Sequence, residues 1–138
     1  GRSLEVNSAA VGVLGDIGIV DVSGALPQPG LYERSVKSGD VVTAVGYPLG
    51  GELRLSRGVV VDLVEGERFA VPGQVVRMTA AVLPGNSGGP VLDQQGRVVA
   101  VVFAREIATG LALAIPIETM ERLITAGGLE DVPGCGVE

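Results

Sequence analysis

The segment Pro84–Val91 reads PGNSGGPV and lies between runs of apolar and β-branched residues that are typical of short strands. A serine flanked by glycines in such a turn can be exposed at the rim of a sheet, with the surrounding backbone N–H groups directed at an incoming carbonyl oxygen. Acyl transfer needs this arrangement, and the N–H groups of Gly85 and Ser87 are the predicted donors to the developing oxyanion. A surface hairpin with an inert serine is the simpler interpretation, but the full string in a β-rich chain favours chemistry. A phosphate-binding loop fits less well, because neither a lysine nor a helical pattern follows the glycines.

Around this segment the chain reads as short strands separated by turn signals. The runs recur at roughly ten-residue spacing, which predicts a closed or sandwiched β unit; they are Asp40–Val45, Gly58–Leu63, Val75–Ala81, Pro90–Leu92, Val98–Ala104 and Leu111–Ile117. The tetrapeptide Asp93–Gly96 predicts a tight hairpin turn. Apolar residues at helical spacing predict one short helix over Glu118–Ala126, and Gly127 and Gly128 can cap its C-terminus.

Upstream of these runs lies a smaller unit. The short runs Leu4–Val6, Ala10–Leu14 and Ile17–Val22 predict a small antiparallel meander. The segment Ala25–Gly30 carries two prolines and a glycine, and it predicts a linker between two packing units.

Composition narrows the function classes. Hydrophobic residues make up 46% of the 138 residues, charged residues 19% and aromatic residues 3%, so the chain can build a core from small and β-branched side chains and is not disordered. Lys+Arg 10 against Asp+Glu 16 gives a net charge of −6, and the arginines are scattered. Nucleic acid is therefore not an expected partner.

The chain has no histidine and one cysteine, Cys135. The commonest general base and the commonest metal ligand are thus absent, and no Cys/His zinc site can be assembled from this chain. The longest apolar run, Val98–Ala104, is too short to span a membrane, so we expect no membrane contact within this segment. The start on Gly1 and the cysteine without an internal partner indicate a truncated or processed piece.

The string from Gly85 to Pro90 resembles the nucleophile loop of trypsin-like (chymotrypsin-fold) serine proteases. The segment Asp16–Val20 (DIGIV) resembles the strand that carries their triad aspartate, and it precedes the serine as the family order requires. The segments Gly39–Pro48 and Leu113–Pro116 are similar to the bacterial HtrA/DegP-like branch, and the likeness is greatest to the MarP type, which are membrane-anchored periplasmic proteases.

The resemblance implies an all-β fold, a chymotrypsin-like antiparallel double β-barrel. This chain would hold the end of the first barrel over residues 1–24 with Asp16, a linker over 25–38, the complete second barrel over 39–117 with Ser87, and a C-terminal helix and tail over 118–138. Ser87 would be the nucleophile and Asp16 would orient a histidine that lies upstream in the family. A true pseudoprotease that lost its base is the rival interpretation. Taken alone, an Asp after a glycine at a strand entry is more often a turn residue.

For substrate choice, the resemblance places Ala81 at the base of the primary pocket, Phe103, Ala104 and Arg105 along the substrate-pairing strand, and Gly110 on the opposite wall. No carboxylate lies at the base, so small to medium apolar residues are expected before the cut, and no Arg or Lys preference. The alternative without a role in binding is that Phe103 is a core aromatic residue and that Arg105 is a solvated side chain.

The resemblance further implies a serine endopeptidase without a cofactor that acts on polypeptides outside the cytoplasm, periplasmic or extracellular, tethered to the membrane by upstream sequence. Cys135 would pair with a cysteine upstream of this chain, as in the MarP type. Alone, the chain is expected to have little or no activity and to self-associate through surface meant for the upstream half of the protease. The competing class is a dead, protease-like module that binds extended peptides at an open strand edge near Phe103.

Overall fold

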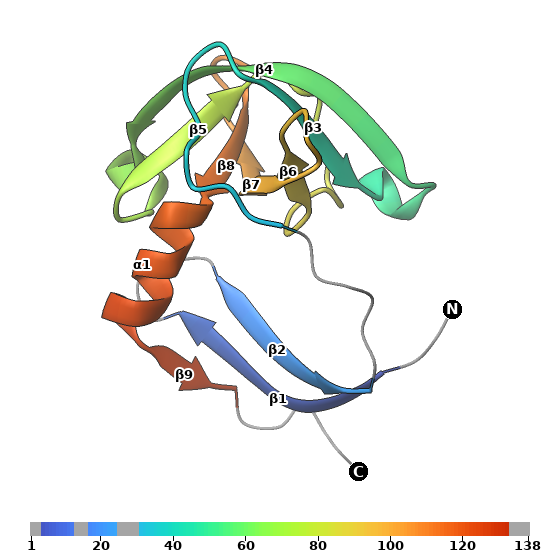
Figure 1. Cartoon of the computed structure of the whole chain (residues 1–138), viewed down its shortest axis with the longest axis vertical. Helices are drawn as coiled ribbons and strands as arrows, with labels where there is room; N and C mark the ends of the chain where they lie inside the picture. The colour runs from blue at the N-terminus through green and yellow to red at the C-terminus, as the bar shows by residue number, and fades with distance from the viewer. Residues whose placement is uncertain (1–3, 13–16, 25–30, 133–138) are drawn as a thin grey trace.

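The computed structural model describes residues 4–12, 17–24 and 31–132, and these residues form two β units joined through one helix. Figure 1 shows the larger unit at the top, the smaller sheet at the bottom and α1 (Ile117–Gly127) running between them. Asp16 and Cys135, together with the linker residues 25–30, lie outside the described residues.

The larger unit is a closed antiparallel barrel of six strands in the order β3-β4-β5-β8-β7-β6. Its strands are β3 (Val41–Gly46), β4 (Arg54–Glu65), β5 (Gln74–Met78), β6 (Pro90–Leu92), β7 (Val98–Arg105) and β8 (Ala112–Pro116). The six runs predicted from the sequence are these six strands, and the prediction of a closed β unit is confirmed. Short 3-10 turns, η1 (Pro48–Gly50) and η2 (Gly66–Phe69), lie at the two ends of β4.

The barrel interior is filled by small and β-branched side chains, as the low aromatic content requires. Alternate residues of β3 point inward, so Val42 and Ala44 are buried while Val41 and Thr43 are partly exposed. The fully buried Met78 is the largest of these core side chains. Because the buried cluster consists of Val and Ala side chains with the single Met78, the strands close around a narrow core.

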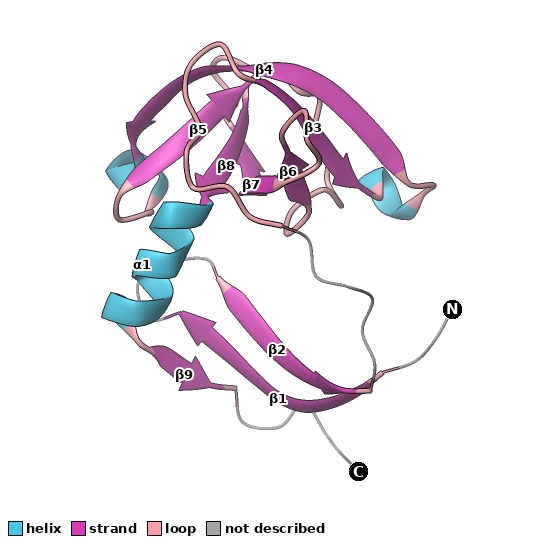
Figure 2. Ribbon diagram, in the orientation of Figure 1, coloured by secondary structure: helices cyan, strands magenta, loops and turns pink. Residues whose placement is uncertain are grey.

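The smaller unit is a three-stranded antiparallel sheet in the order β2-β1-β9, made of β1 (Glu5–Gly12), β2 (Gly18–Ser23) and β9 (Leu129–Asp131). The predicted separate runs Leu4–Val6 and Ala10–Leu14 are wrong as two strands, because one strand continues through them with an irregularity between Val6 and Ser8. The third strand, β9, follows α1 and was not predicted from the sequence. Figure 2 shows how the chain returns through α1 to place β9 beside β1.

Helix α1 holds the two units together. It extends the predicted helix by one residue at each end, and its buried Leu123 packs with Leu113 and Ile115 of β8 in a second apolar cluster. Ile17, which precedes β2, packs against the same cluster. Within the described part of the chain, no helix is long and apolar enough to cross a membrane.

Candidate active site

The predicted nucleophile loop begins with a tight turn over Leu83–Asn86, closed by the Asn86 N–H, which donates to the Leu83 carbonyl at 3.0 Å. Pro84 occupies the second position, and Gly85 in the third has φ +100°. A positive φ at the third position alone is the type II geometry, which favours Pro followed by Gly. The dipeptide Pro84-Gly85 therefore sets the direction in which the chain approaches the serine.

A second turn follows at once over Asn86–Gly89, closed by the Gly89 N–H, which donates to the Asn86 carbonyl at 3.0 Å. Gly88 supplies the positive φ of +83°, so this turn is also type II, with Ser87 exposed at its second position. Two backbone hydrogen bonds fasten the turn to β7, from the Gly88 N–H to the Val102 carbonyl at 2.7 Å and from the Val102 N–H to the Gly89 carbonyl at 3.0 Å. Ser87 therefore projects from the barrel in a turn whose position is held by its hydrogen bonds to β7.

The orientation of the Pro84–Gly85 peptide is set by a contact with η1. The Leu49 N–H donates to the Pro84 carbonyl at 2.6 Å. Because a trans peptide is planar, the Gly85 N–H points away from Leu49. In the described residues neither this N–H nor that of Ser87 donates a hydrogen bond, so both are available to a carbonyl oxygen.

Only glycine fits at position 85, since a Cβ there would lie 2.6 Å from the Tyr47 carbonyl oxygen and 3.0 Å from the Leu49 nitrogen. Leu49 itself has the left-handed backbone conformation, with φ 57° and ψ 23°. A leucine in this conformation is strained, and strain of this kind persists only where the surroundings impose it. The η1 turn therefore supports the nucleophile loop at a cost in backbone energy.

The Ser87 hydroxyl faces two hollows and has one polar contact among the described residues, a long hydrogen bond of 3.4 Å to the Phe103 carbonyl. One hollow has mainly apolar walls; it is lined by Val82, Leu83, Pro84, Ser87, Val102, Ala104 and Arg105. The other lies toward the small sheet and is lined by Ile17, Gly18, Ser87, Gly88, Val101, Val102, Phe103, Ile115 and Met120. The hydroxyl thus lies between an apolar pocket and the space that separates the two units.

The residue before the serine, Asn86, is 2% exposed, and its Oδ1 has no hydrogen-bond partner in the described part of the chain. The side chain is packed on Gly46, where a Cβ would lie 3.0 Å from that oxygen. An amide carries no charge, so this position cannot form an ion pair with an ammonium group.

Beyond Val102, strand β7 has one open edge. On one side Ala104 and Arg105 pair with Leu113 and Ala112 of β8. On the other side β6 pairs no further than Val101, and no described strand continues the ladder. An irregularity between Val102 and Ala104 leaves Phe103 out of the pairing with β8. An extended peptide can therefore add to β7 beside Ser87.

The family model of the trypsin-like peptidase domain matches residues 1–101. The chain belongs to this family. Two relatives from Synechocystis sp. carry the names "Putative serine protease HhoA", 32% identical over all of this chain and 38% of the relative, and "Putative serine protease HhoB", 35% identical over 94% of this chain and 34% of the relative. The chain therefore spans between a third and two fifths of their length.

Solved structures agree with the fold of this trypsin-like domain. The Rv3671c protease from M. tuberculosis in its active form has a TM-score of 0.78 with 22% identity, covering 98% of this chain and 63% of that chain. The HtrA-type protease AlgW with a decapeptide has a TM-score of 0.73 with 20% identity, covering 91% and 41%. The predictions of an HtrA-like, trypsin-like domain and of the chymotrypsin-like fold are confirmed.

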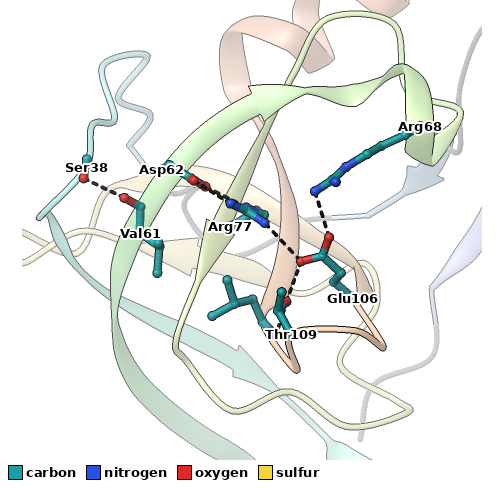
Figure 3. A network of polar contacts seen from close by, with 8 residues as sticks. Ser38, Val61, Asp62, Arg68, Arg77, Glu106 and Thr109 are labelled. Carbon is teal, nitrogen blue, oxygen red and sulfur yellow. Dashed lines mark hydrogen bonds and ion pairs between the residues drawn. The ribbon is translucent and has the colours of Figure 1, made fainter.

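The trypsin-like domain also holds a polar network that includes Glu106, the residue after the end of β7 (Figure 3). The Arg77 guanidinium donates two hydrogen bonds to Asp62, at 2.7 and 2.6 Å, and one of 3.2 Å to Glu106. Arg68 donates to the other Glu106 oxygen at 2.7 Å, and the Thr109 hydroxyl donates to Glu106 as well. The hydrogen bond from the Thr109 hydroxyl, together with Arg77 and Arg68, holds the pKa of Glu106 below its ordinary value, although burial acts in the opposite direction; the hydrogen bond from Arg77 likewise lowers the pKa of Asp62.

The structure brings most of the predicted site residues of this domain together. Ser87, Ala104 and Arg105 line the apolar hollow. Phe103 lines the second hollow, and its carbonyl accepts a hydrogen bond from the Ser87 hydroxyl. Gly110 lies farther along, where its carbonyl accepts the Arg105 Nε–H at 3.3 Å.

Other residues lie differently from the sequence prediction. Ala81 is exposed and does not line either hollow, while the walls next to the nucleophile loop come from Val82, Leu83 and Pro84, which sequence reasoning did not select. The sequence feature that could have pointed to these wall residues is the short apolar run that continues from β5 into the nucleophile loop.

Proposed function

We propose that the full-length protein is a serine endopeptidase in which Ser87 attacks the peptide carbonyl. The observation that carries this proposal is the pair of consecutive type II turns, which raises Ser87 beside two unpaired N–H groups and the open edge of β7. The N–H groups of Gly85 and Ser87 would hold the oxyanion that forms on attack.

The proton of the Ser87 hydroxyl needs a base, and the chain has no histidine. We propose that a histidine from sequence upstream of this chain takes that proton and gives it to the leaving amine as the C–N bond breaks. Asp16 would accept a hydrogen bond from the imidazole and hold the required tautomer. Water then attacks the acyl ester, its proton passes to the same imidazole and returns to Ser87, and the peptide acid leaves.

The described small sheet supports this division of the active site. Strands β1 and β2, with exposed apolar side chains such as Val11 and Val20, would be the end of a first barrel whose remaining strands carry the histidine. The 138-residue chain alone would then retain only roughly 10³ to 10⁴ over the uncatalysed rate. We propose the upstream half of the same protease as its partner.

We propose that the preferred substrates are peptides with an apolar residue directly before the cut. Val82, Leu83 and Val102 line the hollow beside Ser87, and no carboxylate lines it. Because no carboxylate lines this hollow, we expect no preference for Arg or Lys as the substrate residue that enters it.

We propose an oxidising compartment, periplasmic or extracellular, because Cys135 would pair with an upstream cysteine. A membrane tether outside this segment is proposed from the resemblance to the MarP type. Mass analysis of the full-length protein measures whether this thiol is free.

Covalent labelling of the full-length protein by a fluorophosphonate tests the proposal, because an activated serine reacts far faster than an ordinary one. We expect labelling that is lost in Ser87→Ala and kept in Ser35→Ala; Ser35 is an exposed serine that lines neither hollow beside Ser87, and it serves as the matched control. Labelling that survives Ser87→Ala would place the nucleophile elsewhere.

A catalytically dead peptide-binding module is the second candidate, favoured by the absence of any base within hydrogen-bonding distance of the Ser87 hydroxyl among the described residues. It predicts peptide binding at the β7 edge without fluorophosphonate labelling of the full-length protein.

A further inference from the structure

Arg105 is the last residue of β7, and it lines the apolar hollow next to Ser87. Its side chain is exposed, and within residues 4–12, 17–24 and 31–132 it pairs with no carboxylate. Its one polar contact is the 3.3 Å hydrogen bond from Nε to the Gly110 carbonyl, which leaves the terminal nitrogens of the guanidinium available. Arg77 and Arg97 each pair with carboxylates, whereas Arg105, like Arg54 and Arg57, pairs with none among the described residues.

The adjacent acidic residue, Glu106, follows directly after the end of β7. Its carboxylate is engaged by Arg68, Arg77 and Thr109 and forms no ion pair with Arg105 (Figure 3). Asp62 and Glu106 together balance the charges of Arg68 and Arg77. The network is therefore neutral as a group, and the charge of Arg105 is not compensated by it.

The same network fixes the loop that carries Gly110. The Gly110 N–H donates to the Glu106 carbonyl at 2.8 Å, and the Glu106 N–H donates to the Leu111 carbonyl at 2.8 Å. The Leu111 N–H donates to the Thr109 hydroxyl at 3.2 Å. Because Gly110 is fixed in this way, its contact with Arg105 restrains the guanidinium before any ligand arrives.

The direction of β7 indicates which part of a substrate lies next to Arg105. The strand runs from Phe103, beside the Ser87 hydroxyl, to Arg105, two residues or about 7 Å farther on. A peptide that adds antiparallel to this edge runs the opposite way, so the residues before the scissile bond lie along it. Arg105 is then within reach of a side chain about two residues upstream of the one that enters the hollow.

We propose that Arg105 is a specificity-determining residue that binds a carboxylate two residues upstream of the residue that enters the hollow, so that the preferred substrates are peptides with an acidic side chain there and an apolar residue at the cut. This proposal rests on the proposed function for the position of the cut. A guanidinium and a carboxylate at a solvent-exposed rim are expected to give a preference of about two- to fivefold, which corresponds to the usual range for exposed ion pairs and falls with added salt.

Two peptides that differ only by Glu or Gln at this upstream position test the proposal in the full-length protein. We expect kcat/KM to favour the Glu peptide about two- to fivefold, Arg105→Gln to bring the ratio to about one, and Arg105→Glu to prefer a Lys peptide instead. Arg57→Gln, which removes an exposed arginine of β4 that also pairs with no described carboxylate, is the matched control and should leave the Glu/Gln ratio unchanged.

Binding of the same peptides to the full-length Ser87→Ala variant, measured by fluorescence anisotropy, gives the Glu/Gln ratio without catalysis. A protein that cuts neither peptide contradicts the proposed function, while this binding ratio still reports on Arg105. A ratio of one in the parent, a ratio that Arg105→Gln leaves unchanged, or no binding of either peptide would overturn the assignment of Arg105.

Discussion

The substitution Gly85→Ala isolates the support that the η1 turn gives to the nucleophile loop. Position 85 has φ +100°, where an L side chain is strained by about 1–2 kcal/mol. The added Cβ would also lie 2.6 Å from the Tyr47 carbonyl oxygen, and both neighbours it meets are backbone atoms that cannot rotate away. Overpacking of this kind costs a further ~1–3 kcal/mol.

Gly96→Ala is the matched control for backbone strain. Its φ of +75° is also positive, but a Cβ there has nothing within 4 Å. We expect urea unfolding of the chain to show a loss of about 1–2 kcal/mol for Gly96→Ala and about 2–5 kcal/mol for Gly85→Ala. Equal losses in the two variants would refute the close contact between the loop and η1.

Gly85→Ala should also change the chemistry. The clash is relieved when the Pro84–Gly85 peptide rotates, which breaks the hydrogen bond from the Leu49 N–H and turns the Gly85 N–H away from the serine. Loss of one oxyanion donor lowers kcat by about 10²–10³. The assay is peptide hydrolysis by the full-length protein, with Gly96→Ala expected to keep the parent rate, and a Gly85→Ala enzyme with full kcat would show that this N–H is not a donor.

Three further outcomes are expected. Gly58→Ala places a Cβ 2.2 Å from the Ala80 nitrogen and should destabilise the barrel by about 3 kcal/mol or prevent folding, measured by urea unfolding; a neutral result would contradict the close approach of β4 to the segment after β5. Met78→Ala removes the largest fully buried side chain of the barrel and should cost about 2–5 kcal/mol, whereas a loss below 1 kcal/mol would indicate that the core collapses around the cavity. The lowered pKa values of Asp62 and Glu106, against ordinary values of 3.8 and 4.5, mean that the unfolded chain binds more protons in acid, so the free energy of unfolding should fall as the pH drops below about 4.5. Thermal melts of Glu106→Gln should show a smaller fall over the same range, and an unchanged pH profile would exclude Glu106 as a source of it.

The barrel strands could be predicted because their chemistry is local. Each combines β-branched residues with an adjacent turn, and the Asp93–Gly96 turn closes by the hydrogen bond from the Gly96 N–H to the Asp93 carbonyl, as its sequence predicts. The extent of β4 was underestimated, because Gly58 reads as a strand boundary. In the structure β4 continues upstream through Arg54–Arg57, and Gly58 is the point where Ala80, in the segment after β5, approaches closely.

The features that the sequence did not reveal depend on contacts between distant residues. Strand β9 is three exposed residues, two of them acidic, and it becomes a strand only because α1 delivers it to the edge of β1. Glu106 reads as an ordinary acidic residue after a strand, and its importance depends on Arg68 and Arg77, which are 38 and 29 residues away in the sequence. No local pattern encodes either arrangement.

The nucleophile loop and the apolar hollow are built from one folding unit, the closed barrel, and two different elements of it support the loop. The η1 turn orients the Gly85 N–H through Leu49, while β7 holds the serine turn through Val102. At the far end of β7 the Glu106 network holds the loop beside Arg105. None of these contacts involves the small sheet, so the barrel itself holds the turns that present Ser87 and the hollow beside it, whereas Ile17 and Gly18 line the second hollow.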